Sequence, residues 1–474
     1  MTPGWRRAVG IVAIVAILVV VGIIDRSVAP AASPGAAPAP APVAVSRVAP
    51  AAVESAAWYC PGGTGAFGGE VATVLLTNTT GHAVAGTLVA VSSAGPRRSV
   101  SVLVPAGGHL SLVPARLVPG SWVAASVTLD GGGVGATQTV SGPHGNASAP
   151  CASVTSPTWD FATGSTAGTD ALTLALFNPT ATPSSVDVGV VTASGMVQPP
   201  AYQEIQVPAG AVVTESVGDH AQQEAAVGTE VSALSGSVVA LELQQSNEPP
   251  GPAVSLQLGT PTPAPVWSVP QSTQVPKGSV IFHLLNPSDH DTVVRVVVSE
   301  HQSTPPPLLV ALRAQSITAL AASTEIRVPV GTPFAVRFSA AHGVGIVVAR
   351  QVVAPAQKPR PQRGVTVGVA NGAPDWVVPL AAVGGVRAQV LAVASLSTGR
   401  VTVRLAAEHS GNGVPVPFGT SVLSPGGVLA LELPVPAASG VTLEVSATGP
   451  VAVEVDGSPA GAPGVVVFPA LTVG

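Results

Sequence analysis

The chain has 474 residues, too many for one hydrophobic core, and this length corresponds to roughly three or four domains. Charged residues make up 9% and aromatic residues 3%, while Gly and Pro number 52 and 48, so the composition favours strands and turns and predicts an all-β fold. Because 46% of the residues are hydrophobic, disorder is expected only in linkers. The net charge is −5 and Lys277 and Lys358 are the only lysines, so nucleic acid is not expected as a partner.

The amino-terminal residues predict a membrane segment. Residues 8–24 form an apolar run that would extend roughly 26 Å as a helix, nearly the thickness of the hydrocarbon core. Arg6 and Arg7 precede the run and favour a single-pass membrane protein with a cytoplasmic amino terminus and an extracytoplasmic body. Residues 29–31 also fit a signal-peptide cleavage site, which makes secretion after cleavage the alternative. Residues 1–27 are therefore assigned to a cytoplasmic stub and signal-anchor.

Residues 28–52 are rich in alanine and proline. This composition predicts an extended, partly polyproline linker that reaches up to ~3.1 Å per residue. Such a linker would act as a stalk between the membrane and the folded part.

Four copies of one unit follow the linker, and a tryptophan marks the start of each copy. The four are Trp58, Trp159, Trp267 and Trp376, and their successive positions differ by 101, 108 and 109 residues. Three of them begin a Trp-x-x-Pro motif, whereas the second reads WDFA. Single large aromatic residues in β-sandwiches are usually buried, so these are expected to be core residues; binding by an exposed aromatic is the alternative.

A predicted β-hairpin follows each tryptophan. In residues 171–191 (ALTLALFNPTATPSSVDVGVV) two alternating strands flank an Asn-Pro turn. The equivalent turn residues lie 20, 19, 19 and 19 residues after their tryptophans and are Asn78, Asn178, Asn286 and Ser395. A second turn comes about 26 to 30 residues later, and each copy then ends on a valine-rich strand led by glycine. Short strands with frequent turns predict four tandem β-sandwiches of immunoglobulin-like size.

Proline-rich stretches set the expected domain boundaries. The four copies cover residues 53–151, 152–252, 266–353 and 371–474, with linkers at 253–265 and 354–370. A last strand of copy 2 at SLQL is the alternative within the first linker. Residues 466–474 (VVFPALTVG) resemble residues 376–384 (WVVPLAAVG), so four copies carry five versions of the opening strand. The extra strand either completes the preceding unit and couples neighbouring copies, or is an ordinary final strand.

Candidate chemistry is sparse. Cys60 and Cys151 bracket the first copy and, in an exported protein, predict a disulfide, with free buried thiols as the alternative. The weak metal candidate is Asp289-His290-Asp291, whose oxygens could bind a cation, although polar turn residues are usually just solvated. No Cys-x-x-Cys motif, nucleophile elbow or dinucleotide-binding turn is present in a suitable context. No catalytic residue and no cofactor are predicted.

The membrane anchor, the Ala/Pro-rich stalk, WYCPGG at Trp58 and the Asn-Pro turns followed by VPAG resemble single-span exported proteins of unknown function from high-GC actinobacteria. The resemblance covers nearly the whole chain and brings no activity or catalytic residue with it. Since such proteins often accompany cell-envelope glycosylation genes, it implies a place in envelope assembly.

We therefore expect a non-enzymatic, membrane-anchored scaffold or binding protein of the cell envelope, with an envelope protein or glycan as partner. An array of glycan-binding modules is the first alternative, and exposure of the four repeated tryptophans or Trp122 would favour it. A hydrolase or transferase with an unrecognised site is the second alternative, and it should show a polar cleft in only one copy.

Overall fold

The computed structural model describes residues 46–473, with gaps at 66–68, 248–251, 275–277, 301–304, 327, 329, 332, 358–359, 381–385, 410–415, 437–440 and 460–465. The predicted signal-anchor and nearly all of the predicted stalk lie outside these residues. Within them no helix is long and apolar enough to cross a membrane. Strands dominate the described part and its helices are four short 3-10 turns, which confirms the all-β prediction.

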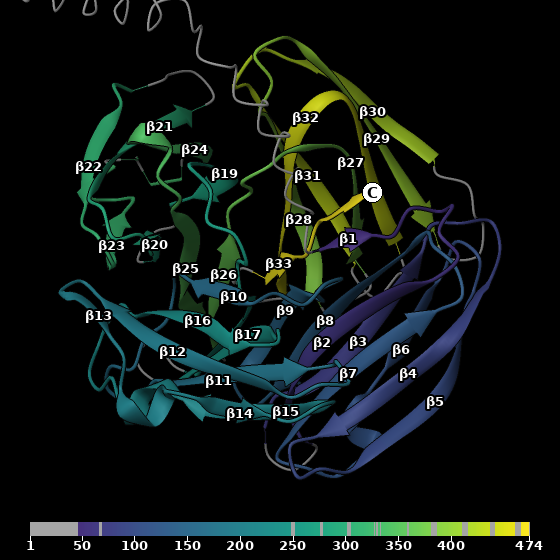
Figure 1. Cartoon of the computed structure of the whole chain (residues 1–474). Helices are drawn as coiled ribbons and strands as arrows, with labels where there is room; N and C mark the ends of the chain where they lie inside the picture. The colour runs from purple at the N-terminus through teal and green to yellow at the C-terminus, as the bar shows by residue number, and fades with distance from the viewer. Residues whose placement is uncertain are drawn as a thin grey trace, which may run out of the picture. The chain divides into compact units, whose positions relative to one another are not determined.

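Copy 2 has two separate sheets (Figure 1). One has the order β10-β16-β12-β13 with β14 beside β12, and the other has the order β15-β11-β17-β18. Leu174 of β11 and Val188 of β12 belong to the same hydrophobic cluster, because alternate residues of each strand point into the space between the sheets. The bounds are β10 Thr158–Phe161, β11 Ala171–Asn178, β12 Ser184–Thr192, β13 Gly195–Val197, η2 Pro200–Tyr202, β14 Ile205–Val207, β15 Ala211–Ser216, η3 Val217–Asp219, β16 Gly228–Ser235, β17 Val239–Ser246 and β18 Ala253–Leu258.

Copy 3 repeats this plan with the sheet orders β19-β24-β21-β22 and β23-β20-β25-β26. Trp267, Phe282 and Phe338 lie in its core, and the two phenylalanine rings are 5.4 Å apart between centroids. The bounds are β19 Val266–Thr273, β20 Ser279–Asn286, β21 Thr292–Glu300, β22 Leu308–Leu312, β23 Ser316–Ala321, β24 Pro333–Ala340, η4 Ala341–Gly343, β25 Val347–Gln357 and β26 Arg360–Val367.

Copy 1 is one continuous sheet of the order β5-β4-β7-β2-β3-β8-β9, with β6 paired to β3. Its two halves join where Thr64 at the end of β2 pairs with Val71 at the start of β3. The bounds are β2 Ala56–Thr64, β3 Val71–Asn78, β4 Val84–Ser92, β5 Arg97–Val104, β6 His109–Leu112, η1 Pro114–Arg116, β7 Trp122–Leu129, β8 Val134–Gly142 and β9 Gly145–Pro150.

Copy 4 is also continuous, because its strand β32 has 19 residues and pairs with β27 and β29 in one half and with β28 in the other. β31 lies beside β28, β30 beside β29, and β33 beside β32. The bounds are β27 Ala373–Pro379, β28 Val386–Ser395, β29 Val401–His409, β30 Val416–Leu423, β31 Val428–Pro436, β32 Val441–Pro459, β33 Val466–Phe468 and β34 Leu471–Val473.

The hairpin predicted over residues 171–191 is wrong. β11 pairs with β15 and β17, whereas β12 pairs with β13, β14 and β16, so the two strands lie in different sheets. The alternating pattern is compatible with both arrangements, because two strands can turn their apolar faces toward each other across a core instead of pairing edge to edge. The Asn-Pro turn therefore carries the chain from one sheet to the other.

The two predicted linkers also differ from the structure. β18 occupies residues 253–258 and pairs with β17, and β26 occupies residues 360–367 and pairs with β25. In the same way β9 pairs with β8, and β33 pairs with β32. Each copy thus has a closing strand beside its valine-rich strand, and these are β9, β18, β26 and β33; in copy 4 one further strand, β34, follows.

The closing strands bring the copies into contact. β18 contacts both β9 and β26, and β33 contacts both β26 and β9, so the contacts form a closed cycle through all four copies. The C-terminal strand β34 pairs antiparallel with β27 of its own copy. It also pairs in parallel with β1 (Arg47–Val48), the first described strand. Copy 4 is therefore tied to the start of the body.

Candidate functional site

The tryptophans of the repeat are buried. Trp122 is 3% exposed and donates its indole N–H to Pro61 O at 2.6 Å. The four repeat tryptophans and their exposed fractions are Trp58 1%, Trp159 0%, Trp267 2% and Trp376 5%. None of these five rings offers a surface on which a sugar could stack.

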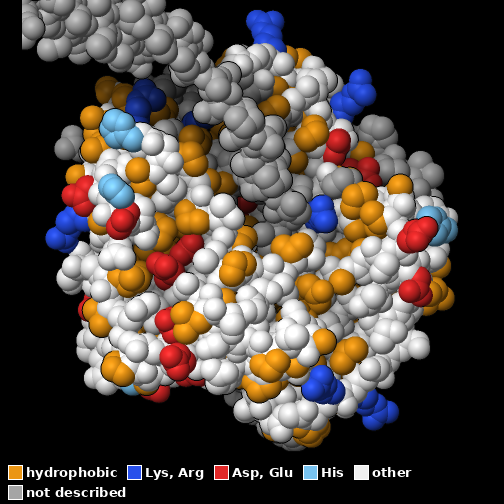
Figure 2. Space-filling model, in the orientation of Figure 1, with side chains coloured by type: hydrophobic (Ala, Val, Ile, Leu, Met, Phe, Trp, Pro, Cys, Tyr) orange, Lys and Arg blue, Asp and Glu red, His pale blue; other side chains and the backbone are white. Residues whose placement is uncertain are grey.

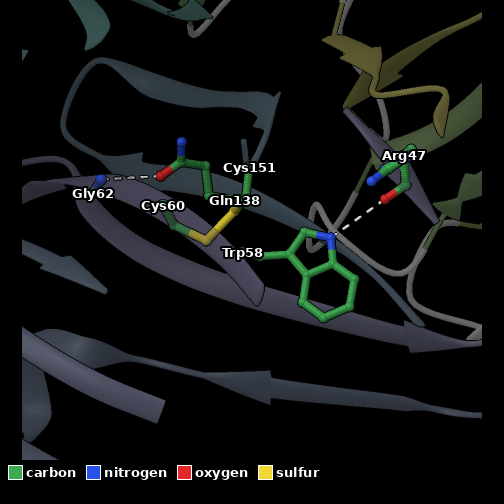
Figure 3. Close-up of a disulfide and its surroundings, with 6 residues drawn as sticks. All are labelled: Arg47, Trp58, Cys60, Gly62, Gln138 and Cys151. Atoms are coloured by element: carbon green, nitrogen blue, oxygen red, sulfur yellow. Dashed lines mark hydrogen bonds between the residues drawn. A yellow bond between two sulfur atoms is a disulfide. The ribbon is translucent and has the colours of Figure 1, made fainter. Parts of the chain in front are cut away.

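The indole N–H groups explain why the tryptophan recurs. In copies 2, 3 and 4 the N–H of the repeat tryptophan donates to a main-chain carbonyl at the start of the valine-rich strand. The accepting atoms are Val238 O at 2.8 Å, Ile346 O at 2.7 Å and Val451 O at 3.1 Å. In copy 1 the indole of Trp58 donates to Arg47 O at 3.3 Å (Figure 3). The ring thus ties the first strand of each copy to another part of the chain.

Asn178 ties two turns of copy 2 together. Its Nδ2 donates to Thr182 O at 2.8 Å within the first turn and to Val207 O at 3.0 Å in the second turn. Its Oδ1 accepts from Thr180 N–H at 2.9 Å, as expected of an asparagine that caps its own turn. Asn78 and Asn286 also join the two turns of their copies: beside the matching bonds within the first turn, Asn78 donates to Val104 O and Pro105 O, and Asn286 donates to Arg313 O.

Ser395 departs from this pattern. It is buried like the asparagines, but its hydroxyl has no hydrogen-bond partner. The serine side chain is too short to reach both turns, so copy 4 lacks this link.

The predicted disulfide is confirmed. The sulfur atoms of Cys60 and Cys151 are 2.06 Å apart and the bond joins β2 to the residue that follows β9 (Figure 3). Next to it the main-chain N–H of Gly62 donates to Gln138 Oε1 at 3.0 Å. The bridge holds the closing strand of copy 1 against its opening strand.

The metal candidate in the turn after β20 is open to solvent. Asp289 and His290 contact each other and are 78% and 77% exposed. Asp291 instead accepts the N–H of Ala314 at 2.8 Å. No group of three or more metal-ligating side chains occurs among the described residues. The three residues therefore serve the turn and form no coordination shell.

The visible surface carries no concentrated feature. In Figure 2 the charged side chains lie singly or in small groups, and the hydrophobic side chains lie in small patches among white backbone and small polar groups. Exposed large apolar residues such as Leu103, Leu309 and Val422 belong to edge strands of their sheets. Single exposed apolar residues are normal on a soluble surface.

One cluster of charged side chains is instead buried where copies 3 and 4 meet. Arg350 of β25 is 1% exposed and its guanidinium contacts Glu454 and Asp456 of β32, the latter at 3.0 Å. Burial raises the pKa of Glu454 well above its usual value, although the guanidinium opposes this shift. This cluster forms the polar part of the junction between copies 3 and 4.

The junction between copies 2 and 3 contains a small cavity. Glu242 of β17 is buried, accepts a hydrogen bond from the Thr229 hydroxyl at 2.5 Å, and leaves Oε2 without a partner. Burial raises the pKa of Glu242 to about 8. The cavity is lined by Thr163, Gly164, Leu172, Glu242, Gln244, Ser255 and Gln257 of copy 2 and by Gln351 and Val365 of copy 3.

A second pair of acids faces copy 3 on the other sheet of copy 2. Asp160 of β10 pairs in register with Glu230 of β16, so the two side chains lie on the same face. Burial and the charge of Glu230 raise the pKa of Asp160 to about 8. The same face meets copy 3 through apolar groups, since Leu285 lies next to Gly228.

Copy 1 meets both of its neighbours through polar contacts. His144 lies 2.5 Å from Glu70 of its own copy and 3.4 Å from Gln245 of copy 2. On the other side, Ser148 of β9 donates to Val467 O of β33 at 2.6 Å. Each of the four junctions thus includes at least one hydrogen bond or ion pair between copies.

These junctions were missed by sequence reasoning. Glu242, Arg350 and Glu454 all stand inside valine-rich strands, GSVVALEL, GVGIVVARQV and GPVAVEV. A charged residue in such an apolar strand is a signal that it needs a partner, because an unpaired buried charge is strongly unfavourable. The partner could not be named, since it lies in a different copy.

No protein-family model matches the chain, and no curated protein matches it. Among solved structures, Thermotoga maritima 1070 is 15% identical, with 23% of this chain and 94% of that chain covered and a TM-score of 0.20. The Anabaena sensory rhodopsin transducer is 21% identical, with 18% of this chain and 89% of that chain covered and a TM-score of 0.16. A tetra-tandem repeat from the extending region of a large adhesion protein is 12% identical, with 85% of this chain and 96% of that chain covered and a TM-score of 0.10. Scores this low carry no argument about function.

Proposed function

We propose that the protein is a non-enzymatic, membrane-anchored scaffold or binding protein outside the cytoplasm, with a body of four immunoglobulin-sized β-sandwiches. The observation that carries this proposal is the closed cycle of contacts between the closing strands. This cycle joins the four copies into one body. The recurring tryptophan and asparagine side chains are buried inside that body, where they form hydrogen bonds to the main chain. A body of this kind suits the presentation of a fixed surface to another macromolecule.

The disulfide supports the location. Disulfides persist in oxidising compartments outside the cytoplasm. The bond between Cys60 and Cys151 joins the first strand of copy 1 to the residue that follows its last strand. The apolar run at residues 8–24 and the Ala/Pro-rich stalk supply the anchor and the spacer in this proposal.

An envelope protein is the favoured partner over a glycan. A glycan-binding array would rely on exposed aromatic rings, and the five tryptophans of the described body are buried. An enzyme is the weaker alternative, because the described residues bring no nucleophile, base and acid into one open cleft. The buried acids Asp160 and Glu242 face neighbouring copies instead.

The location is tested by treating intact cells with a protease and probing for the full-length chain. Digestion of the body in intact cells, with a cytoplasmic protein untouched, is expected. Protection of the body until the cells are lysed would contradict the extracytoplasmic location. A variant with Arg6→Glu and Arg7→Glu is the matched control, because removal of the positive charges should lower the fraction that is correctly oriented.

The scaffold role is tested by crosslinking with mass spectrometry in the native envelope. Reproducible crosslinks from the body to one or a few envelope proteins are expected. Crosslinks to glycan strands alone would favour the glycan alternative, and turnover of an envelope polymer by the purified chain would contradict the non-enzymatic role.

A further inference from the structure

Two buried polar atoms face the cavity between copies 2 and 3 without a partner in the protein. They are Oε2 of Glu242 and Nε2 of Gln257. The two residues pair in register on β17 and β18, so their side chains lie on the same face, and both line the cavity. Gln257 uses its other atom, Oε1, to accept the Thr163 hydroxyl at 2.7 Å. An amide donor and a carboxyl oxygen are thus both left to interact with whatever fills the cavity.

We propose that this cavity is a binding site for one water molecule held between Glu242 and Gln257, and that Glu242 is protonated when the water is bound. The volume open to a water-sized ligand is about 10 Å³, about the minimum that a cavity needs to hold one water molecule. Water can accept from the amide of Gln257 and from the carboxyl O–H of Glu242. Ser255 and Gln351 offer further acceptors, which gives the water the two to four partners that buried waters have.

A metal ion fits the site poorly. A calcium ion requires roughly six to eight oxygen ligands, and Gln244 already spends both ends of its amide on other groups. Its Oε1 accepts from Ser165 N–H, and its Nε2 donates to Ala171 O. The free amide donor of Gln257 would also point toward the cation. The donor set therefore selects a neutral, hydrogen-bonding ligand.

Comparison with the next copy explains why the acid is neutral. Glu242 lies four residues after Val238 and Arg350 lies four residues after Ile346, and these are the residues whose carbonyls accept the tryptophan indoles. Arg350 meets carboxylates from copy 4. The copy 3 residues that line the cavity with Glu242 are Gln351 and Val365, and neither of them is charged. A buried carboxylate without a cation is unfavourable, which favours the protonated form.

The acids on neighbouring elements do not face the cavity. Asp160 of β10 and Glu230 of β16 share the face of their sheet that is turned toward copy 3, away from Thr229 and Glu242. They cannot donate a hydrogen bond to Glu242 or share its proton.

The basic groups near the cavity are committed elsewhere. Arg363 of β26 pairs with Asp170, and Arg350 of β25 pairs with copy 4. His144 contacts Glu70 on the opposite side of β17. His283 of β20 is neutral at physiological pH, because burial lowers its pKa to about 4. Among the described residues around the cavity, no cation is left to hold Glu242 in its ionised form.

Infrared spectroscopy of the full chain tests the protonation state. Wild type is expected to show a protonated carboxyl band at pH 6 that is absent from Glu242→Gln. The wild-type band should disappear near pH 8, the value to which burial raises the pKa of Glu242. Subtraction of the Glu242→Gln spectrum removes the contribution of Asp160, which titrates in the same range. Identical spectra for wild type and Glu242→Gln at pH 6 would overturn the proposal, and Glu204→Gln is the exposed control.

A crystal structure of the full chain tests the ligand. One water within hydrogen-bonding distance of both Glu242 Oε2 and Gln257 Nε2 is expected at pH 6, and Gln257→Leu should remove it. A dry cavity, or density surrounded by short oxygen contacts typical of a cation, would overturn the proposal. Leucine has a volume similar to that of glutamine, so the Gln257→Leu variant is expected to fold. Its melting temperature checks this.

Discussion

Nη2 of Arg350 in copy 3 lies 3.0 Å from Oδ1 of Asp456 in copy 4, and Glu454 contacts the same nitrogen. Burial lowers the pKa of this guanidinium, but the two carboxylates outweigh burial and the net shift is upward. Arg350 also donates to Gln271 O and to Ser272 Oγ of its own copy. The arginine therefore links two strands of copy 3 to β32 of copy 4.

Replacement of this arginine should be strongly destabilising. In Arg350→Met the buried Glu454 and the partly buried Asp456 lose their counter-charge, and the loss of a partner from a buried ion pair costs about 3–5 kcal/mol. The free energy of unfolding, measured with denaturant on the full chain, should fall by that amount. Arg337→Met is the matched control, because Arg337 is exposed on β24 and should change stability by less than about 0.5 kcal/mol.

A triple variant separates charge from packing. If Arg350→Met is combined with Glu454→Gln and Asp456→Asn, no charge stays buried and most of the lost stability should return. Equal stability of the single and triple variants would show that the ion pair is not the cause.

The turn asparagine offers a comparison between copies. Asn178→Ala removes the hydrogen bonds to Thr182 O and Val207 O, leaves these acceptors to find new donors, and should lower the free energy of unfolding by about 2–4 kcal/mol. Ser395→Ala at the same position of copy 4 removes a hydroxyl that has no partner and should be close to neutral. Thermal unfolding of the two variants checks this contrast, and similar losses at both positions would argue against the link between the turns.

Asn178 also shows what sequence reasoning could reach. A proline after an asparagine predicts a turn, and the structure has a turn there. The pattern does not show whether the flanking strands pair with each other, because both a hairpin and a crossing between sheets turn alternate residues toward one core. That choice depends on strands far away in the sequence, such as β15 and β16.

The closing strand of copy 3 and the junctions were beyond local reasoning for a related reason, whereas SLQL in the first linker already suggested a last strand of copy 2. Proline in GPAVSLQL and KPRPQRGVTV predicts a linker, yet each segment is the outermost strand of its sheet, where a missing N–H is tolerated. The partner of Arg350 lies 106 residues away in another copy. The disulfide was predictable, because the sequence predicts export and its two cysteines allow only one pairing.

The acid Asp160 should make stability depend on pH. Its pKa is raised from 3.8 to about 8 in the folded chain, so between these values the folded state binds a proton that the unfolded state does not. A rise in pH through this window therefore lowers the free energy of unfolding. Asp160→Asn cannot ionise and should be more stable than wild type at pH 8, by on the order of a few kcal/mol at most.

Denaturant unfolding at pH 5 and pH 8 measures this effect. The difference between the two pH values should shrink in Asp160→Asn, and Glu242, Glu454 and His283 contribute to the remainder. Asp130→Asn, at an exposed position, should keep the wild-type difference. An unchanged pH dependence in Asp160→Asn would mean that Asp160 is ionised in the folded chain.

Deletion of residues 465–474 tests the closure of the contact cycle. The deletion removes β33 and β34, and with them the buried side chains of Phe468 and Leu471 and the pairing of β34 with β1 and β27. Loss of a buried phenylalanine and a buried leucine should together lower the free energy of unfolding by at least about 5 kcal/mol. Hydrogen exchange should become faster in β1 and β27, which lose a paired strand, and in β9, which loses its contact with β33. Val473→Ala, at a position that is 41% exposed, is the control and should leave the melting temperature nearly unchanged. If the deleted chain melted like wild type, the last strand would be a dispensable addition and the cycle would not depend on it.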